Sequence, residues 1–247
     1  MTASARGAAG IVYVAVPSAA VRAAADTLGG LDVFLSPQER AASQRFLRGE
    51  DRLDYAASHV LFRVLAASRL GLAPDDAAGL DVRRACAGCG STGHGKPSIE
   101  GTGLSMSRSR GTVMVAAGPP GCSLGADIER VPAQVFAGFD DFALAPEERP
   151  GPLGTEVSDA GRIRLWVAKE AALKAAGLGL AVDPSSVRLV PAGTSGSLRA
   201  ESPGNPAVHG LLVTPVPAPG GYFAAVASAA GPPAGAVSLA EIFATKR

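Results

Sequence analysis

The middle of the chain reads Thr112-Val-Met-Val-Ala-Ala117, then Gly118-Pro-Pro-Gly121, then Cys122-Ser-Leu-Gly-Ala-Asp-Ile-Glu129. The two apolar runs are typical of β-strands, and the four residues between them are typical of a hairpin loop. Because side chains alternate along a strand, Asp127 and Glu129 share one face while their apolar neighbours face the core. The sequence therefore predicts an antiparallel hairpin whose second strand presents two carboxylates side by side.

The residues just before this stretch also alternate. Leu104-Ser-Met-Ser-Arg-Ser109 is predicted to be a strand, with the three serines on one face and Leu104, Met106 and Arg108 on the other. A glycine-rich segment from Cys86 to Gly103, which contains His94-Gly-Lys-Pro97, precedes it and is predicted to be a loop.

Further elements are expected on both sides. Upstream we predict a buried strand at Ile11–Val16, a helix with a capping box at Ser36-Pro-Gln-Glu39, and a longer helix over Leu53–Leu65 that stops at Gly71. Downstream we predict a helix at Ile163–Ala176, strands at Ser186–Val190, Leu211–Val216 and Tyr222–Ala227, and a short helix capped by Ser238-Leu-Ala-Glu241. This order lacks strict strand–helix–strand alternation, so it favours an α+β fold with antiparallel sheets.

Length and composition narrow the class of protein. The 247 residues can bury a core without disulfides, and the three cysteines do not form the pattern of a secreted scaffold. The net charge of +1 is too small to indicate nucleic-acid binding. The apolar run Ile11–Val16 is too short for a signal peptide, and none approaches the roughly 20 residues of a membrane span. We therefore expect a soluble cytoplasmic protein that binds neither nucleic acid nor membranes.

Three acidic residues suggest a metal site. Asp127 and Glu129 would offer Mg²⁺ two oxygen ligands from one strand face, although a solvated strand end would show the same pattern. Trp166, Glu170 and Lys174 follow one another at i, i+4 spacing and line one helix stripe. The alternative for this stripe is an ordinary exposed Glu–Lys pair beside a core tryptophan.

Lysine usage favours a functional stripe. The chain has 19 arginines and only four lysines, and three of the four, Lys96, Lys169 and Lys174, lie in the motifs described here. A compact ammonium can meet a phosphate as a point charge, so retention of lysine at these positions indicates phosphate contacts.

Taken in order, the motifs resemble those of the Sfp-type 4′-phosphopantetheinyl transferases. The resemblance rests on Gly95-Lys-Pro97, Leu104-Ser-Met-Ser-Arg-Ser109, Gly125-Ala-Asp-Ile-Glu129, and Trp166-Val-Ala-Lys-Glu170 followed by Lys174 and Gly177-x-Gly-Leu180. Leu35-Ser-Pro-x-Glu-Arg40 and the helix with Arg63 are similar as well, so the resemblance spans about residues 11–222.

The resemblance implies both a fold and an activity. The fold would be two similar α+β lobes in a pseudo-twofold arrangement, residues 1–121 and residues 122–247, with the metal site on the second. The activity would be that of a holo-[carrier protein] synthase, which transfers 4′-phosphopantetheine from coenzyme A to a serine of an acyl or peptidyl carrier protein. Mg²⁺ would be required, and adenosine 3′,5′-bisphosphate would be released. The carrier would belong to polyketide, nonribosomal peptide or fatty acid biosynthesis, and the enzyme would be a monomer.

The resemblance also implies residue roles. Asp127, Glu129 and Glu170 would hold Mg²⁺, and Glu170 would serve as the general base for the incoming serine. Lys174 would meet the pyrophosphate as a second catalytic residue. The remaining coenzyme A contacts would come from Arg63, Lys96, Ser107, Arg108 and Lys169.

One position departs from the family pattern. The family has Ser-His-Ser where this chain has Ser107-Arg108-Ser109, and that histidine contacts phosphate. Arginine also binds phosphate, but it is longer than histidine and its forked guanidinium cannot superpose on an imidazole. The alternative function is therefore a catalytically weakened module that binds coenzyme A or a carrier protein.

A second kind of metal site is also compatible with the sequence. Cys86-x-x-Cys89 and His94 could supply three zinc ligands, with Cys122 as a fourth, and would make a small interaction domain. A structural zinc site normally has two ligand pairs, so a plain glycine-rich loop is the competing interpretation. His59 lies in an apolar helical run and is expected to be a packed or surface histidine.

Overall fold

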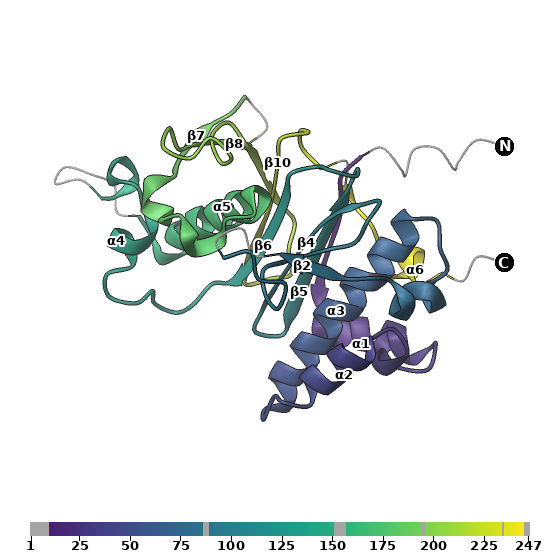
Figure 1. Cartoon of the computed structure of the whole chain (residues 1–247). Helices are drawn as coiled ribbons and strands as arrows, with labels where there is room; N and C mark the ends of the chain where they lie inside the picture. Colours follow the sequence, from purple (N-terminus) through teal and green to yellow (C-terminus); the bar gives the residue numbers. More distant parts are fainter. Residues whose placement is uncertain (1–9, 86–88, 151–156, 194–195, 234, 245–247) are drawn as a thin grey trace.

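The computed structural model describes residues 10–85, 89–150, 157–193, 196–233 and 235–244, and these form an α+β fold with two main sheets (Figure 1). The first sheet has the order β11 (Gly235–Ala236), β1 (Val12–Pro17), β5 (Thr112–Gly118) and β4 (Gly103–Ser109). The second has the order β6 (Leu124–Arg130), β10 (Tyr222–Ser228), β9 (Leu212–Val216), β8 (Leu198–Glu201) and β7 (Arg188–Pro191). Neighbours are antiparallel except for β1 and β11, so the predicted fold class is confirmed.

Helices from both ends of the chain cover the first sheet. They are α1 (Ser18–Asp26), α3 (Gly49–Arg69) and α6 (Leu239–Ile242), while α2 (Pro37–Ser43) packs on α3. The predicted capping boxes form at Ser36 with Glu39 and at Ser238 with Glu241. Helix α3 begins at Gly49, earlier than its apolar pattern predicts, because its first turn is polar and exposed.

Helix α5 (Asp159–Ala176) packs on the second sheet. The Ser158 hydroxyl accepts a hydrogen bond from Gly161 N, and Gly177 ends the helix in the left-handed conformation with φ 74°. Short helix α4 (Phe139–Ala143) adjoins it. A small third sheet pairs β2 (Arg83–Ala85) with β3 (Lys96–Ser98), and β3 lies inside residues 86–103, the segment predicted to be a loop. Short 3-10 helices lie at Leu31–Val33, Pro74–Gly79, Pro146–Glu148, Gly179–Ala181 and Pro184–Ser186.

The predicted hairpin between β5 and β6 is wrong. Strand β5 instead forms its hairpin with β4, around Arg110 (φ 40°) and Gly111 (φ 88°), and β1 occupies its other edge. A two-residue turn with both φ values positive matches the right-handed twist of the strands, which explains the hairpin of β4 with β5. Because β4 and β1 occupy the two edges of β5, no edge is left for β6. The Gly118-Pro-Pro-Gly121 loop therefore carries the chain from the first sheet to the second, where β6 pairs with β10.

Serine side chains link β4 to β6. The hydroxyls of Ser105 and Ser109 accept hydrogen bonds from the backbone N–H groups of Ala126 (2.9 Å) and Arg130 (3.2 Å). The predicted shared face of the serines is thus confirmed, and it faces the strand that carries the carboxylates. Because these bonds satisfy backbone donors of β6 beside the first sheet, they fix the register between the two sheets.

Helix α5 lies unusually close to β6 at Gly125. A Cβ built on Gly125 would lie 1.8 Å from the backbone oxygen of Ala171, so any other residue would collide with the helix backbone. This contact sets the height of α5 over the strand that bears Asp127 and Glu129.

The strands of the second sheet all follow residue 122, but β11 and α6 return to the first sheet. The boundary at residue 121 and the pseudo-twofold relation remain predictions. None of the helices in the described residues is both long and apolar enough for a membrane span.

Candidate active site

Residues from β4, β6, α3 and α5 line a cavity of about 380 Å³. Its lining is Ser58, Met106, Ser107, Arg108, Asp127, Glu129, Trp166, Glu170 and Lys174. The strand pattern and the helix stripe identified in the sequence therefore meet in one place, with all three predicted metal ligands, Lys174 and the Ser107–Arg108 pair.

A partly buried ion pair links α5 to β6. Lys174 Nζ lies 2.5 Å from Asp127 Oδ1, which also accepts a hydrogen bond from Ser107 Oγ at 2.7 Å. The Asp127 side chain is only 2% exposed, whereas the Lys174 side chain is 28% exposed, so the carboxylate is buried and the lysine is partly open to solvent. Burial is the largest single influence and lowers the pKa of Lys174, but the charge and hydrogen bond of Asp127 together with the charges of Glu170 and Glu129 outweigh it, so the pKa is raised. The ammonium therefore stays charged and holds the two elements together.

The other two carboxyl groups have perturbed acidities. Burial raises the pKa of Glu170 to about 7; the charges of Asp127 and Glu129 add to the rise, and Lys174 opposes it. Burial also raises the pKa of Glu129, while the hydrogen bond from Ser109 Oγ at 2.6 Å opposes the rise. Three carboxyl groups around one cavity repel one another when ionised, and such a cluster favours a cationic ligand.

Two oxygen atoms in this cavity suit a metal ion. Asp127 Oδ2 and Glu170 Oε1 are buried and receive no hydrogen bond from any residue that the structure describes. An unsatisfied buried carboxylate oxygen is costly, and hard oxygen donors are the ligands that Mg²⁺ prefers. The described residues contain no group of three acidic, histidine or cysteine side chains already gathered at ligand spacing. The two unpartnered oxygens suit a hard cation such as Mg²⁺ by their chemistry, although the carboxylates of the described residues are not gathered at metal-ligand spacing.

Arg108 forms part of the cavity wall. Its guanidinium carbon lies 5.3 Å from the ring centre of Tyr55 and 6.0 Å from that of Phe46, and Nη1 lies 3.5 Å from Ser58 Oγ. No carboxylate of the described chain forms an ion pair with Arg108. The rings of Tyr55 and Phe46 thus hold the guanidinium of Arg108 at the cavity wall, where its positive charge has no carboxylate partner among the described residues.

Lys96 lies next to this site rather than in it. Its ammonium donates hydrogen bonds to the carbonyl oxygens of Leu124 (2.6 Å) and Lys174 (3.1 Å), at the joint between β6 and α5. It lines two further cavities of about 310 and 730 Å³, and the smaller one shares Met106 and Lys174 with the carboxylate cavity. Burial lowers the pKa of Lys96. The cation is therefore placed along a continuation of the site.

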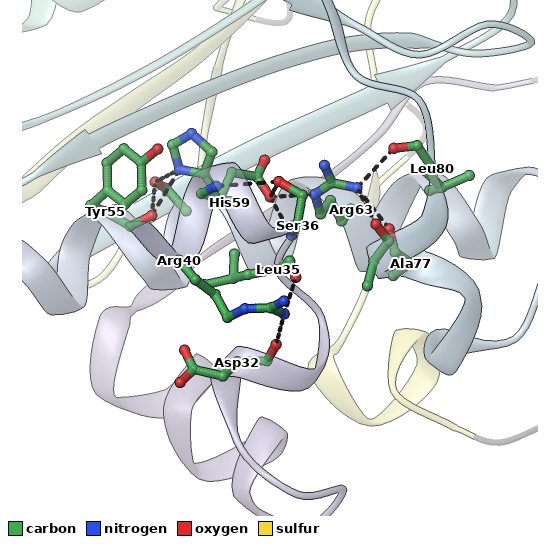
Figure 2. A network of polar contacts seen from close by, with 12 residues as sticks. Asp32, Leu35, Ser36, Arg40, Tyr55, His59, Arg63, Ala77 and Leu80 are labelled. Atoms are coloured by element: carbon green, nitrogen blue, oxygen red, sulfur yellow. Dashed lines mark hydrogen bonds and ion pairs between the residues drawn. The ribbon is translucent and has the colours of Figure 1, made fainter. Parts of the chain in front are cut away.

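The structure does not bring Arg63 into the carboxylate cavity. Its guanidinium is buried, forms a 2.6 Å ion pair with Glu39, and donates to the carbonyl oxygens of Ala77 and Leu80, each at 2.9 Å (Figure 2). Glu39 is the second member of the capping box at the start of α2. Arg63 thus ties α3 to two neighbouring segments.

Lys169 is also separated from the cavity. It is fully buried, pairs with Glu148 at 2.5 Å, and donates to the carbonyl oxygen of Ala143 at 2.7 Å. These partners lie on the side of α5 away from Glu170. Lys169 therefore anchors the segment before α5 and does not provide the phosphate contact that the scarcity of lysine indicated.

The cysteine and histidine motif is only partly described. Cys86 lies outside the described residues, while Cys89 Sγ and His94 Nε2 are 3.3 Å apart on the surface. Cys122 contacts Ser228 Oγ at 3.4 Å. His59 is buried and stacks on Tyr55 with ring centres 4.0 Å apart, so it is a packed histidine rather than a surface one.

Sequence reasoning missed several parts of the site. Tyr55 and Ser58 on α3 contact Arg108 and hold it in place. Their i, i+3 spacing puts them on one face of the helix, and this spacing was the sequence pattern that could have identified them. Phe142, on the short helix α4, lies 5.4 Å from Trp166 between ring centres. Helix α4 has five residues, too few for a periodic pattern to be recognised.

Residues 123–215 match the family model of the 4′-phosphopantetheinyl transferase superfamily, abbreviated ACPS. The matched range contains β6 and α5, the two elements that carry the carboxylates and Lys174. Comparison with curated proteins gave no match. The chain thus carries, over residues 123–215, a transferase domain of the 4′-phosphopantetheinyl transferase superfamily.

Proposed function

We propose that this protein is an Sfp-type enzyme that transfers 4′-phosphopantetheine from coenzyme A to a serine hydroxyl of an acyl or peptidyl carrier protein. The observation that carries the proposal is the meeting of Asp127 and Glu129 with Glu170 and Lys174 in one cavity between a strand and a helix. Carboxylates and a fixed cation at a shared cavity suit phosphoryl transfer, which depends on positioning and charge neutralisation.

Asp127, Glu129 and Glu170 are the residues that would hold Mg²⁺. The two buried oxygens without protein partners, Asp127 Oδ2 and Glu170 Oε1, support this assignment. When bound, the ion would neutralise charge on the phosphate oxygens of coenzyme A.

The cationic residues would bind the pyrophosphate of coenzyme A. Lys174 is anchored on Asp127, and Arg108, which lines the same cavity, is held by Tyr55. Lys96 lies where the site continues into the adjoining cavities, so it would contact a more distant phosphate. Each cation is fixed by protein contacts, so little ordering is needed when the ligand enters.

Glu170 would act as the general base. Glu170 lines the cavity, and burial raises its pKa to about 7, so its carboxylate would accept the proton of the serine hydroxyl near neutral pH. The serine oxygen would then form a bond to the phosphorus next to the pantetheine. The bond from that phosphorus to the bridging pyrophosphate oxygen would break, and adenosine 3′,5′-bisphosphate would leave.

Intact-mass measurement tests the proposal. The protein is incubated with coenzyme A, Mg²⁺ and a panel of apo carrier proteins, with a parallel reaction in excess EDTA. We expect at least one carrier to gain the mass of phosphopantetheine, and EDTA to abolish the gain. Binding of coenzyme A in calorimetry without any transfer would instead establish the weakened binding module.

A further inference from the structure

The connection between α2 and α3 carries an unusual exposed leucine. Leu47 is fully exposed, and its neighbours Arg45 and Arg48 are exposed as well (residues 44–48, at the lower end of α3 in Figure 1). A single exposed leucine would need no explanation, but this one stands between two arginines at the end of a connection between helices. We name residues 45–48 the arginine–leucine tip.

The positive charge of the tip is not neutralised within the protein. Arg22, Arg45, Arg48 and Arg52 lie at or beside it, and none forms an ion pair with a residue that the structure describes. The two nearby acids, Glu50 and Asp51, occupy the first turn of α3, where the helix terminus stabilises them. Four cations against two anions leave a locally positive surface around an apolar side chain.

The tip adjoins the candidate active site. Phe46, the third residue of the connection, packs on Tyr55 with ring centres 5.2 Å apart, and Arg108 lies over both rings. Arg108 in turn lines the cavity with Glu170. A macromolecule that inserts a serine into this cavity therefore passes close to Leu47 and its arginines.

We propose that the arginine–leucine tip is a docking surface for the carrier protein whose serine enters the cavity; this inference rests on the proposed function. The partner surface would present carboxylates to Arg45 and Arg48 and an apolar recess to Leu47. Such an arrangement gives affinity through the apolar contact and speeds association through the opposite charges. Coenzyme A, which binds in the cavity, does not use this surface.

Steady-state kinetics with a carrier that the unaltered protein modifies tests the docking surface. The variants are Leu47→Ser and the double charge reversal Arg45→Glu with Arg48→Glu. Matched controls are Leu72→Ser, at another leucine that is 38% exposed, and Arg199→Glu, at an exposed arginine of strand β8. The KM for coenzyme A and the thermal unfolding temperature are measured for every protein.

We expect the KM for the carrier to rise about five- to tenfold in Leu47→Ser, because a leucine contact is lost. In the charge-reversal variant we expect kcat/KM for the carrier to fall at least tenfold at low salt, with a weaker salt dependence than in the parent. The KM for coenzyme A and both control variants should stay within about twofold of the parent.

Three results would overturn the docking surface while leaving the proposed function in place. The first is that the tip variants match the controls in kcat/KM for the carrier, and the second is that they lose kcat/KM equally for coenzyme A and the carrier. A tip that joins two copies of this chain would also overturn it, and light scattering would show this as a lower mass for Leu47→Ser than for the parent. If the unaltered protein modified no carrier in the panel, the proposed function and this inference would fail together.

Discussion

Gly125→Ala is the substitution for which the structure makes the strongest prediction. The added Cβ would lie 1.8 Å from Ala171 O and 2.5 Å from Ala175 N, both backbone atoms of α5. Neither atom can rotate away as a flexible side chain would. The helix must therefore move away from β6, and Glu170 and Lys174 must move with it relative to Asp127.

The size of the effect follows from this distance. To restore even a 3.0 Å contact, the helix must retreat by about 1.2 Å, the difference from the present 1.8 Å. Overpacking of this kind costs about 1–3 kcal/mol. In a domain of this length that corresponds to a fall of roughly 2–12 °C in the unfolding temperature. Misplacement of catalytic groups by about 1 Å can cost on the order of 10²-fold in rate.

Differential scanning calorimetry and the carrier-modification assay together measure both effects. We expect Gly125→Ala to remain folded at 25 °C but to lose far more activity than stability. The control is Gly204→Ala, since a Cβ there meets no atom within 4 Å and the backbone angle is ordinary. A Gly125→Ala variant with the parent's unfolding temperature and rate would refute the close contact between α5 and β6.

Substitutions at four further residues test the roles of single side chains. Glu170→Gln should lower the transfer rate by about 10²–10⁴-fold with little change in coenzyme A affinity, and loss of affinity alone, seen by calorimetry, would exclude the base role. Lys174→Ala should weaken coenzyme A binding as well as rate, which the same titrations measure; unchanged affinity would count against the pyrophosphate contact. Arg108→Ala should raise the KM for coenzyme A about tenfold or more, and Arg108→His should restore much of the loss; saturation curves with the alanine variant equal to the parent would contradict this. Burial lowers the pKa of His59 to about 4, so the unfolded chain takes up the proton first as pH falls. The stability present above about pH 6.5 should therefore decline by about 3 kcal/mol towards pH 4 in urea titrations, and His59→Gln should flatten this decline; parallel slopes would refute it.

Local patterns predicted the individual elements of the site but not how the sheets pair. Period-two alternation placed Asp127 and Glu129 on one face of a strand, and helical spacing placed Glu170 and Lys174 on one stripe; both are found. The hairpin partner was predicted wrongly, because an apolar strand buried on both faces does not indicate which neighbours it pairs with. The two-residue Arg110-Gly111 connection was the sequence signal for the actual hairpin.

Arg63 and Lys169 show a different limit of sequence patterns. Lys169 precedes Glu170 by one residue, so its side chain points about 100° away around the helix, to the side where Glu148 lies. Arg63 meets Glu39 from 24 residues earlier in the chain. A cation in a phosphate-binding motif and a cation in a buried ion pair look identical in sequence, because the partner comes from a distant segment.

The central claim is that the cavity at Asp127, Glu129, Glu170 and Lys174 transfers phosphopantetheine. The most direct test is intact-mass spectrometry of an apo carrier protein after incubation with coenzyme A, Mg²⁺ and either the unaltered protein, Asp127→Ala or Glu129→Ala. We expect the phosphopantetheine mass gain with the unaltered protein and none with either variant, although both variants should remain folded by circular dichroism. Full modification of the carrier by both variants would contradict the claim.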